Sequence, residues 1–209
     1  MTVLVVTAVE AEAKALAMPG HVMVVVGGIG RVNAAAAATE AILRNPGVTA
    51  VISAGVAGIL PGADLRIGDT LLADSCVYAE EGIETPGGFQ DMTGLGFPLG
   101  DFPGNRVPVD PVLLESCRSD FPTAPIATVA TCSGTTARAQ LIARQTGAAA
   151  EAMEGAAVVH AARRLGLPAL EIRAMSNTTG DRQDQQWDLQ AGLAALGDAV
   201  EKVVSGIPG

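Results

Sequence analysis

The stretch AAAEAMEGAAVVHAARRLGLPALEIRAMSNTTGDRQDQQW, residues Ala148 to Trp187, decides the expected fold. Its apolar runs predict a strand over Ala148–Met153, a helix over Glu154–Leu165 and a second strand over Ala169–Met175. Gly166 tolerates the left-handed conformation in which helices often end. A strand–helix–strand unit of this length predicts two parallel strands joined by a right-handed crossover.

Polar residues follow both strands, Glu154 after the first and Asn177 after the second. Because ligands gather beyond the carboxyl ends of strands in open parallel sheets, we expect this acid and this amide at one edge of the sheet. Glu154 also begins a helix that is apolar on nearly every side, and a carboxylate at the mouth of a buried helix needs partners or a ligand. We therefore favour a functional role for Glu154 over that of a simple helix-start acid.

Polar residues also follow two other predicted strands. The apolar run Val3–Val6 leads into Glu10 and Glu12, and Ser133 follows a predicted strand over Pro125–Ala130. Acids in the first turn of a helix complement its dipole, which is a sufficient explanation for Glu10. For Glu12 the sequence leaves this role and a functional role equally open.

Two glycine-rich segments follow predicted strands, GGIGR at 27–31 and AGVAG at 54–58. The second is expected to be a turn that ends a strand over Ala50–Ser53. The first opens a helix over Val32–Leu43 and resembles half of a dinucleotide-binding fingerprint, but Asn33 replaces the third glycine. Its backbone N–H groups are suited to an anion, and close packing against a strand explains the glycines about as well.

Glycine and proline are frequent from Glu80 to Pro111, which predicts a long irregular loop that serves as a lid, a subunit contact or a binding loop. An amphipathic helix is expected from Leu189 to Val204. Together these elements predict one α/β domain over residues 1–209. Its central sheet is expected to be mixed, largely parallel and twisted, with helices on its flanks.

Composition narrows the classes of function. The formal net charge of −9 over 209 residues argues against nucleic acid or an anionic membrane surface as a partner. The three cysteines form no CxxC pair, as is typical of a reducing compartment. The amino terminus has no basic segment, and its apolar run is too short to cross a bilayer. We expect a soluble, cytoplasmic protein without a membrane partner.

The order of GGIGRVNAA, ISAGVAG, LRIGD, SGT, AMEGAA and RAMSNTTGD resembles the nucleoside phosphorylase and nucleosidase superfamily over essentially the whole chain. The similarity is greatest to its methylthioadenosine/S-adenosylhomocysteine nucleosidase branch. The stretches Tyr78–Phe89 and Ser176–Asp188 resemble a narrower group, the futalosine hydrolases of an alternative menaquinone pathway. This resemblance implies a nucleoside phosphorylase-like fold, cleavage of futalosine to dehypoxanthine futalosine and hypoxanthine, and a homodimer or larger homo-oligomer.

The resemblance also implies a site. Glu12 would be the base that activates the attacking water, and Glu154 would accept hydrogen bonds from the ribose hydroxyls. Trp187 stands where the nucleosidases place an aromatic ring near the substrate, although a core anchor is an equal alternative for the only tryptophan of the chain. The other residues implied to contact a purine nucleoside are Val56, Ala57, Gly58, Met153 and Ser176. No metal or organic cofactor is expected.

Asn177 differs from the residue expected in the adenine-cleaving members of the family. The resemblance implies that those members have an aspartate at this position. A protonated aspartic acid donates to N7 of adenine and accepts from the exocyclic amine. A 6-oxopurine presents two acceptors on that edge, N7 and O6, whereas an asparagine amide offers N–H donors. Because a mismatched base leaves buried polar groups unpaired, Asn177 predicts a hypoxanthine- or guanine-type base.

Three alternatives remain from the sequence. A purine nucleoside phosphorylase also uses asparagine for 6-oxopurines, and Arg31 is a candidate phosphate ligand, but the carboxylate of Glu12 would repel phosphate. A methylthioadenosine nucleosidase is disfavoured by Asn177. A non-catalytic nucleotide-binding or redox module is disfavoured by the incomplete glycine fingerprint.

Overall fold

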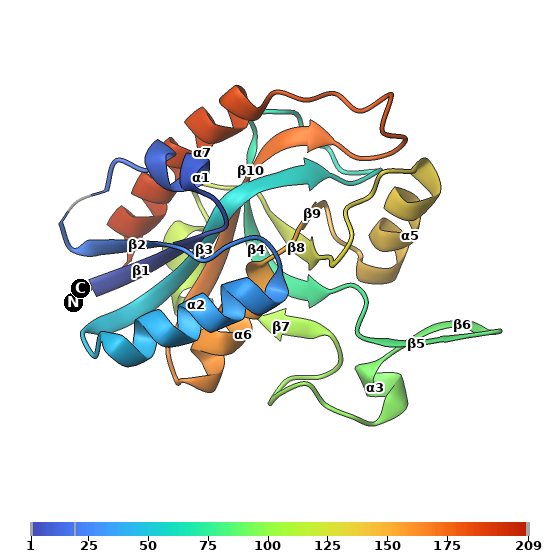
Figure 1. Ribbon diagram of the computed structural model, residues 1–209, viewed down its shortest axis with the longest axis horizontal. Coiled ribbons are helices and arrows are strands. Elements are labelled where there is room, and N and C mark those ends of the chain that lie inside the picture. Colours follow the sequence, from blue (N-terminus) through green and yellow to red (C-terminus); the bar gives the residue numbers. More distant parts are fainter. Residues whose placement is uncertain (1, 19, 208–209) are drawn as a thin grey trace.

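The computed structural model describes residues 2–18 and 20–207, which form a mixed sheet with helices on both faces (Figure 1). The strands of this sheet are β1 (Thr2–Thr7), β2 (Val22–Val26), β3 (Val48–Ile59), β4 (Thr70–Tyr78), β7 (Arg106–Pro108), β8 (Thr123–Thr128), β9 (Ala150–Ala152) and β10 (Ala169–Thr178). The helices are α1 (Glu10–Ala15), α2 (Arg31–Arg44), α3 (Met92–Leu95), α4 (Pro111–Cys117), α5 (Thr136–Thr146), α6 (Gly155–Arg164) and α7 (Leu189–Gly206).

Part of the sheet closes on itself. The path β10-β4-β8-β9-β3 is completed by a further pairing of β3 with β10, so these strands form a ring, while β1 and β2 extend from β3. The pairs β1–β2, β1–β3, β3–β10, β4–β8 and β8–β9 are parallel, and β4–β10, β3–β9 and β4–β7 are antiparallel. The expected α/β fold with a mixed, largely parallel sheet is therefore confirmed.

The helices form two layers that bury the sheet. In Figure 1, α1 and α7 lie above the strands, and α2 and α6 lie together below them. The close packing of α2 on α6 rests on small side chains, since α2 buries Ala34, Ala38 and Ala41 on the face that it turns inward. Gly166, which follows the C-cap residue Leu165 of α6, has a φ of 74°, as expected for a glycine that ends a helix. Among the described residues, no helix combines the length and the apolar character needed to cross a membrane.

The predicted parallel crossover through α6 is wrong. β10 runs parallel to β3, but β9 pairs antiparallel with β3 through Gly58 and Ile59, so β9 and β10 run in opposite directions. The strand over Ala148–Met153 is also shorter than expected, spanning only Ala150–Ala152. The cause is the closed ring: β9 joins the far end of β3 from the β8 side and does not lie beside β10.

Two further predictions need correction. The segment 54–58 is not a turn, because β3 continues through it as a single strand of 12 residues up to Ile59. The predicted irregular loop from Glu80 to Pro111 holds regular elements: β7, the short helix α3, and a hairpin of β5 (Gly82–Thr85) and β6 (Gly88–Asp91). This hairpin projects from the body of the fold at the right of Figure 1.

Candidate active site

A cavity of about 520 Å³ opens where the carboxyl ends of β1 and β9 approach each other along one flank of β3. β10 occupies the other flank from Val51 to Ile59. β1 and β9 therefore share the remaining flank, β1 beside Val48–Ser53 and β9 beside Gly58. Because β1 and β9 run in opposite directions, their carboxyl ends point toward one another, and so do the acids that follow them.

The structure brings all the site residues named from the sequence into this cavity. Its lining includes Glu12, Val56, Ala57, Gly58, Met153, Glu154, Ser176, Asn177 and Trp187. They come from α1, β3, the β9–α6 junction, β10 and the loop before α7. Their shared location is a finding of the structure, and their chemical roles stay predictions.

The carboxylate of Glu12 is fixed by backbone N–H groups on two elements. Oε2 accepts from Ala8 N at 2.9 Å and from Val9 N at 3.2 Å, and Oε1 accepts from Val56 N of β3 at 2.9 Å. The residue is 3% exposed. Glu12 thus stabilises the start of α1 and also lines the cavity. Its role at the helix start is shown, and its functional role stays a prediction.

Glu154 lies at the start of α6, and the residue is 7% exposed. Its carboxylate contacts the glycine-rich segment before α2. Oε1 accepts from Gly30 N at 3.0 Å, and Oε2 lies 3.4 Å from Nη1 of Arg173. The GGIGR turn therefore binds an anion as its N–H groups permit, but this anion is a side chain of the protein.

A buried ion pair lies behind the two cavity acids and was not anticipated from the sequence. Arg173 Nε donates to Glu171 Oε1 at 2.8 Å, and both side chains are almost fully inaccessible. Burial lowers the pKa of Arg173, but Glu171, Glu154 and Glu12 together raise it above its ordinary value, so this side chain stays cationic. The signal was present in the sequence, because two charges interrupt the otherwise apolar run that forms β10.

Gly55 makes this arrangement possible. A β-carbon at this position would lie 2.5 Å from Oε1 of Glu12 and would overlap the guanidinium of Arg173. Only a residue without a side chain lets β3 lie this close to both the acid and the cation.

Asn177 lies at the opposite side of β3 from Glu151 and is 8% exposed. Its Oδ1 accepts from Ser176 Oγ at 2.8 Å, and its Nδ2 donates to Thr178 O at 3.0 Å. Ser176 therefore orients the amide, with the oxygen held by its hydroxyl and the nitrogen turned away from it. A side chain at Gly58 would come within 3.0 Å of Nδ2, so this glycine keeps the space beside the amide open.

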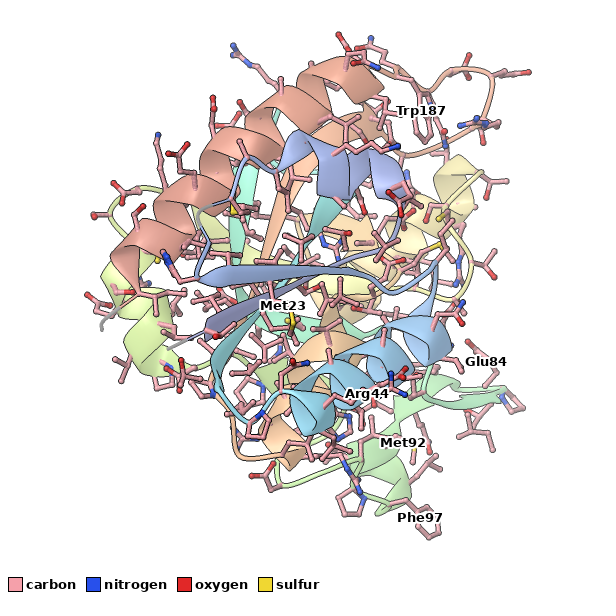
Figure 2. All side chains as sticks on the ribbon, turned by 60° about the vertical axis from the view of Figure 1, so that its left-hand side comes forward. Met23, Arg44, Glu84, Met92, Phe97 and Trp187 are labelled. Atoms are coloured by element: carbon pink, nitrogen blue, oxygen red, sulfur yellow. The ribbon has the colours of Figure 1, made fainter. Side chains whose placement is uncertain are left out.

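Trp187 is not a core anchor, since it is 52% exposed and stands in the loop before α7 (Figure 2). It is bridged to Asn177 through the backbone, and its Nε1 donates to Gln185 Oε1 at 3.0 Å. The guanidinium of Arg182 lies 4.7 Å from the ring centre. The ring thus forms part of the cavity wall, which removes one of the two alternatives.

Glu151 is a further acid of the cavity wall and was not predicted from the sequence. Its two carboxylate oxygens accept from the backbone N–H and the hydroxyl of Ser133, at 2.7 and 2.6 Å. Burial raises the pKa of Glu151 above its ordinary value, and the two hydrogen bonds from Ser133 oppose that rise. The available signal was an acid inside an alanine-rich strand.

Arg31 does not line this cavity. Its guanidinium pairs with Glu81 and lies 3.8 Å from Glu80, which also pairs with Arg138 of α5. These ion pairs hold the end of β4 against α2 and α5. The arginine considered as a phosphate ligand is therefore engaged by carboxylates.

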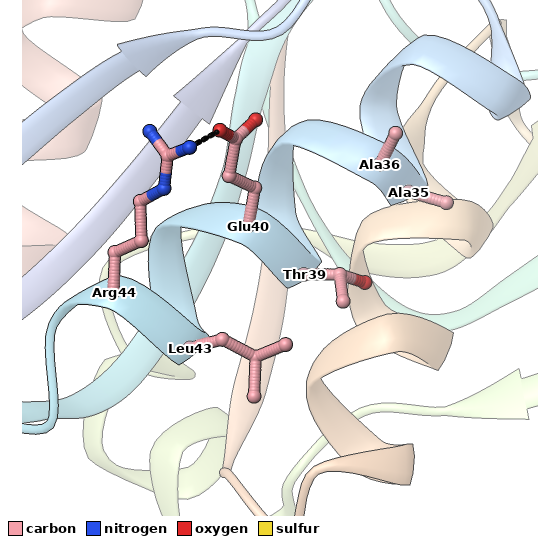
Figure 3. A pocket seen from close by; sticks show the side chains of 6 residues that line it. All are labelled: Ala35, Ala36, Thr39, Glu40, Leu43 and Arg44. Atoms are coloured by element: carbon pink, nitrogen blue, oxygen red, sulfur yellow. Dashed lines mark ion pairs between the residues drawn. The ribbon is translucent and has the colours of Figure 1, made fainter.

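A second hollow of about 530 Å³ lies on the outer face of α2 (Figure 3). Its lining consists of alanines, Thr39, Leu43 and an exposed ion pair of Arg44 with Glu40 at 2.7 Å. It offers no buried acid or amide, in contrast to the cavity at β3. Among residues 2–18 and 20–207, no cluster of three His, Cys, Asp or Glu side chains is placed to hold a metal ion.

Comparison with known proteins identifies the family of the chain. A sequence profile of the phosphorylase superfamily matches residues 11–205. The futalosine hydrolase of Streptomyces coelicolor is 40% identical over 157 residues, which are 73% of this chain and 64% of that protein. The futalosine hydrolase of Thermus thermophilus is 37% identical over 186 residues, 85% of this chain and 79% of that protein. The matched region thus spans just under two thirds of the Streptomyces relative.

Among solved structures, a 5′-methylthioadenosine/S-adenosylhomocysteine nucleosidase from Helicobacter pylori superposes with a TM-score of 0.79. The superposition covers 99% of each chain, and the two sequences are 19% identical. At this identity the likeness shows a shared fold, and the choice of substrate depends on the residues that line the cavity.

Proposed function

Since the chain belongs to the phosphorylase superfamily and groups there with futalosine hydrolases, we propose that it hydrolyses the N-ribosidic bond of a 6-oxopurine nucleoside. The substrate that fits best is futalosine, cleaved to dehypoxanthine futalosine and hypoxanthine for menaquinone biosynthesis. The observation that carries the proposal is one cavity with a backbone-fixed carboxylate, Glu12, and an oriented amide, Asn177, in its wall.

In this mechanism the glycosidic bond breaks through an oxocarbenium-like transition state. Glu12 holds and deprotonates a water molecule on the face of the sugar opposite the base. Glu154 accepts hydrogen bonds from the ribose hydroxyls, with Met153 against the sugar, and its charge stabilises the cationic ring. Asn177 donates to the departing purine and reduces the negative charge that builds on it. An amide transfers no proton, so solvent supplies the proton that the base takes up.

Water is favoured over phosphate as the nucleophile for two reasons. Arg31, the candidate phosphate ligand, is paired with Glu81, and the N–H of Gly30 is already donated to Glu154. The carboxylates of Glu12 and Glu154 also make the sugar end of the cavity anionic, which repels phosphate. A phosphorolytic enzyme is therefore the second candidate, with the weaker support.

The base-recognising group disfavours an adenine-type nucleoside. In the observed orientation, the oxygen of Asn177 is taken by Ser176 and its nitrogen faces the space above Gly58. An N–H donor can pair with N7 and O6 of a 6-oxopurine, because both are acceptors. The exocyclic amine of adenine is itself a donor and cannot pair with it.

We also propose that the enzyme works as a homodimer or larger homo-oligomer in the cytoplasm. Large apolar side chains are exposed at Val32 and Leu43 of α2 and at Phe97 beyond α3, the last at the outer edge of Figure 2. Cys76, Cys117 and Cys132 are all free thiols, which suits a reducing compartment. Light scattering on a size-exclusion column tests the assembly, and a monomeric mass at micromolar concentration would refute it.

The test of the activity is a base-release assay on futalosine, inosine and methylthioadenosine, each with and without phosphate. We expect release of hypoxanthine from futalosine in phosphate-free buffer and little release from methylthioadenosine. Strict dependence on phosphate would identify a phosphorylase, and a preference for methylthioadenosine would show that the role given to Asn177 is wrong.

A further inference from the structure

Glu151 and Asn177 lie on either side of the same glycine. Gly58 of β3 is the register partner of Glu151 on β9 and of Asn177 on β10. Side chains at paired positions of neighbouring strands point to the same face of a sheet, and here all three residues line the cavity. Neighbouring strands are about 4.8 Å apart, so the two backbones face each other across roughly 10 Å with no side chain between them.

The carboxylate of Glu151 is held rigidly. Ser133 donates to it with both its N–H and its hydroxyl, and Ser133 O in turn accepts from Gln185 Nε2 at 2.9 Å. Glu151 is 5% exposed, and each of its oxygens keeps a lone pair beyond the one that Ser133 uses. A preorganised acceptor of this kind favours a ligand N–H at a fixed position and disfavours a lone pair.

The amide of Asn177 pairs with only part of the polar edge of a 6-oxopurine. One N–H of its amide is donated to Thr178 O, so a single N–H remains for a ligand. That donor serves the N7 and O6 edge. The adjoining edge of a 6-oxopurine carries the N1–H donor, which needs an acceptor when the base is buried.

We propose that Glu151 is a specificity-determining residue that accepts a hydrogen bond from N1–H of the bound 6-oxopurine, opposite the amide of Asn177. This inference rests on the proposed function. A 6-aminopurine has a lone pair at N1. Its N1 and the carboxylate are then both acceptors and cannot form a hydrogen bond. The two residues thus read adjacent edges of the base, and each rejects the 6-amino form independently of the other.

The first test uses the unmodified protein. Dissociation constants are measured by calorimetry for hypoxanthine, 1-methylhypoxanthine and adenine, the first being the only one with an N1–H. We expect hypoxanthine to bind at least 100-fold more tightly than either of the others. Equal binding of hypoxanthine and 1-methylhypoxanthine would overturn the role of Glu151. Binding of adenine in preference to hypoxanthine would overturn the proposed function as well.

The second test exchanges the acceptor for a donor. In Glu151→Gln, the ratio of kcat/KM for a 6-oxopurine nucleoside to that for the matching 6-aminopurine nucleoside should fall at least 100-fold. Ser133→Ala keeps the carboxylate and should lower activity while preserving the sign of the preference. Glu84→Gln, on the exposed hairpin strand β5, is the matched control and should leave the ratio unchanged.

The outcomes separate the two proposals. A fall in activity of Glu151→Gln that is equal for both nucleosides would mean a purely structural role for Glu151, with the hydrolase assignment intact. Absence of 6-oxopurine release by the unmodified protein would instead refute the proposed function and this inference together.

Discussion

Glu12 is the residue that we propose as the base that activates water. Three backbone N–H groups fix its carboxylate, so it is held in place before a substrate arrives. We expect Glu12→Gln to lower kcat for 6-oxopurine nucleoside hydrolysis by about 10²–10⁴-fold, because an amide cannot accept a proton from water. Steady-state kinetics measure the effect, with Glu10→Gln as the control on the exposed side of the same helix. Wild-type turnover in Glu12→Gln would contradict its role as the base.

Asn177 is the residue that we propose to select the type of base. Aspartic acid in its place presents a donor to N7 and an acceptor to an exocyclic amine. We therefore expect Asn177→Asp to shift the kcat/KM ratio of 6-oxo to 6-aminopurine nucleosides by at least about 100-fold toward the amino form. Competition assays with paired nucleosides measure the ratio. Asn33→Asp, at an exposed position of α2, should leave it unchanged.

At the scale of elements, β3 is the strand on which the site depends. It continues through 54–58 with glycines where other groups approach its backbone, Glu12 and Arg173 at Gly55 and the amide of Asn177 at Gly58. A strand that carried side chains there would push the acid, the guanidinium and the amide away from the positions they occupy.

A side chain at position 55 of β3 should destabilise the protein. Gly55→Ala should lower the free energy of unfolding by about 1–3 kcal/mol, since its methyl group overlaps buried charged groups that have no room to move. Urea unfolding measures the loss. Gly47→Ala, where a methyl group meets only Thr2 Oγ1 at 3.8 Å, is the matched control and should be near neutral. Equal stability of the two variants would show that the site accommodates a side chain at 55.

At the scale of the whole molecule, the buried pair Glu171–Arg173 links stability to pH. Burial raises the pKa of Glu171 above 4.5, and Arg173 offsets only part of that rise. The folded protein therefore holds this proton more tightly than the unfolded chain. The contribution of Glu171 to the free energy of unfolding is complete below its pKa in the unfolded chain. It is lost as the pH rises through its pKa in the folded protein.

Glu171→Gln cannot lose a proton and should gain stability relative to the parent as the pH is raised from about 4.5 toward neutrality. Urea unfolding at a series of pH values measures the difference in free energy. Glu115→Gln on α4, where the side chain is 76% exposed, is the control and should show no such trend. A difference between the parent and Glu171→Gln that is independent of pH would contradict the raised pKa.

The sequence by itself determined part of the composition of the site. Polar residues that follow apolar runs, such as Glu12, Glu154 and Asn177, are local features, and local rules place them at strand ends and helix starts. The fold class followed for the same reason, because alternating strands and helices leave few ways to cover a sheet. The chain also held signals that were not used, namely the charges of Glu151, Glu171 and Arg173 inside apolar strands.

Only the tertiary structure decided how these residues meet. The predicted parallel crossover would have placed Glu154 and Asn177 at the ends of neighbouring strands. Instead, closure of the sheet sets β9 against the far end of β3, and the carboxyl ends of β1 and β9 converge from opposite directions. Strand pairing depends on contacts between residues far apart in the chain, which local periodicity does not encode. The same long-range closure places Glu151 opposite Asn177 and the Gly30 N–H on Glu154.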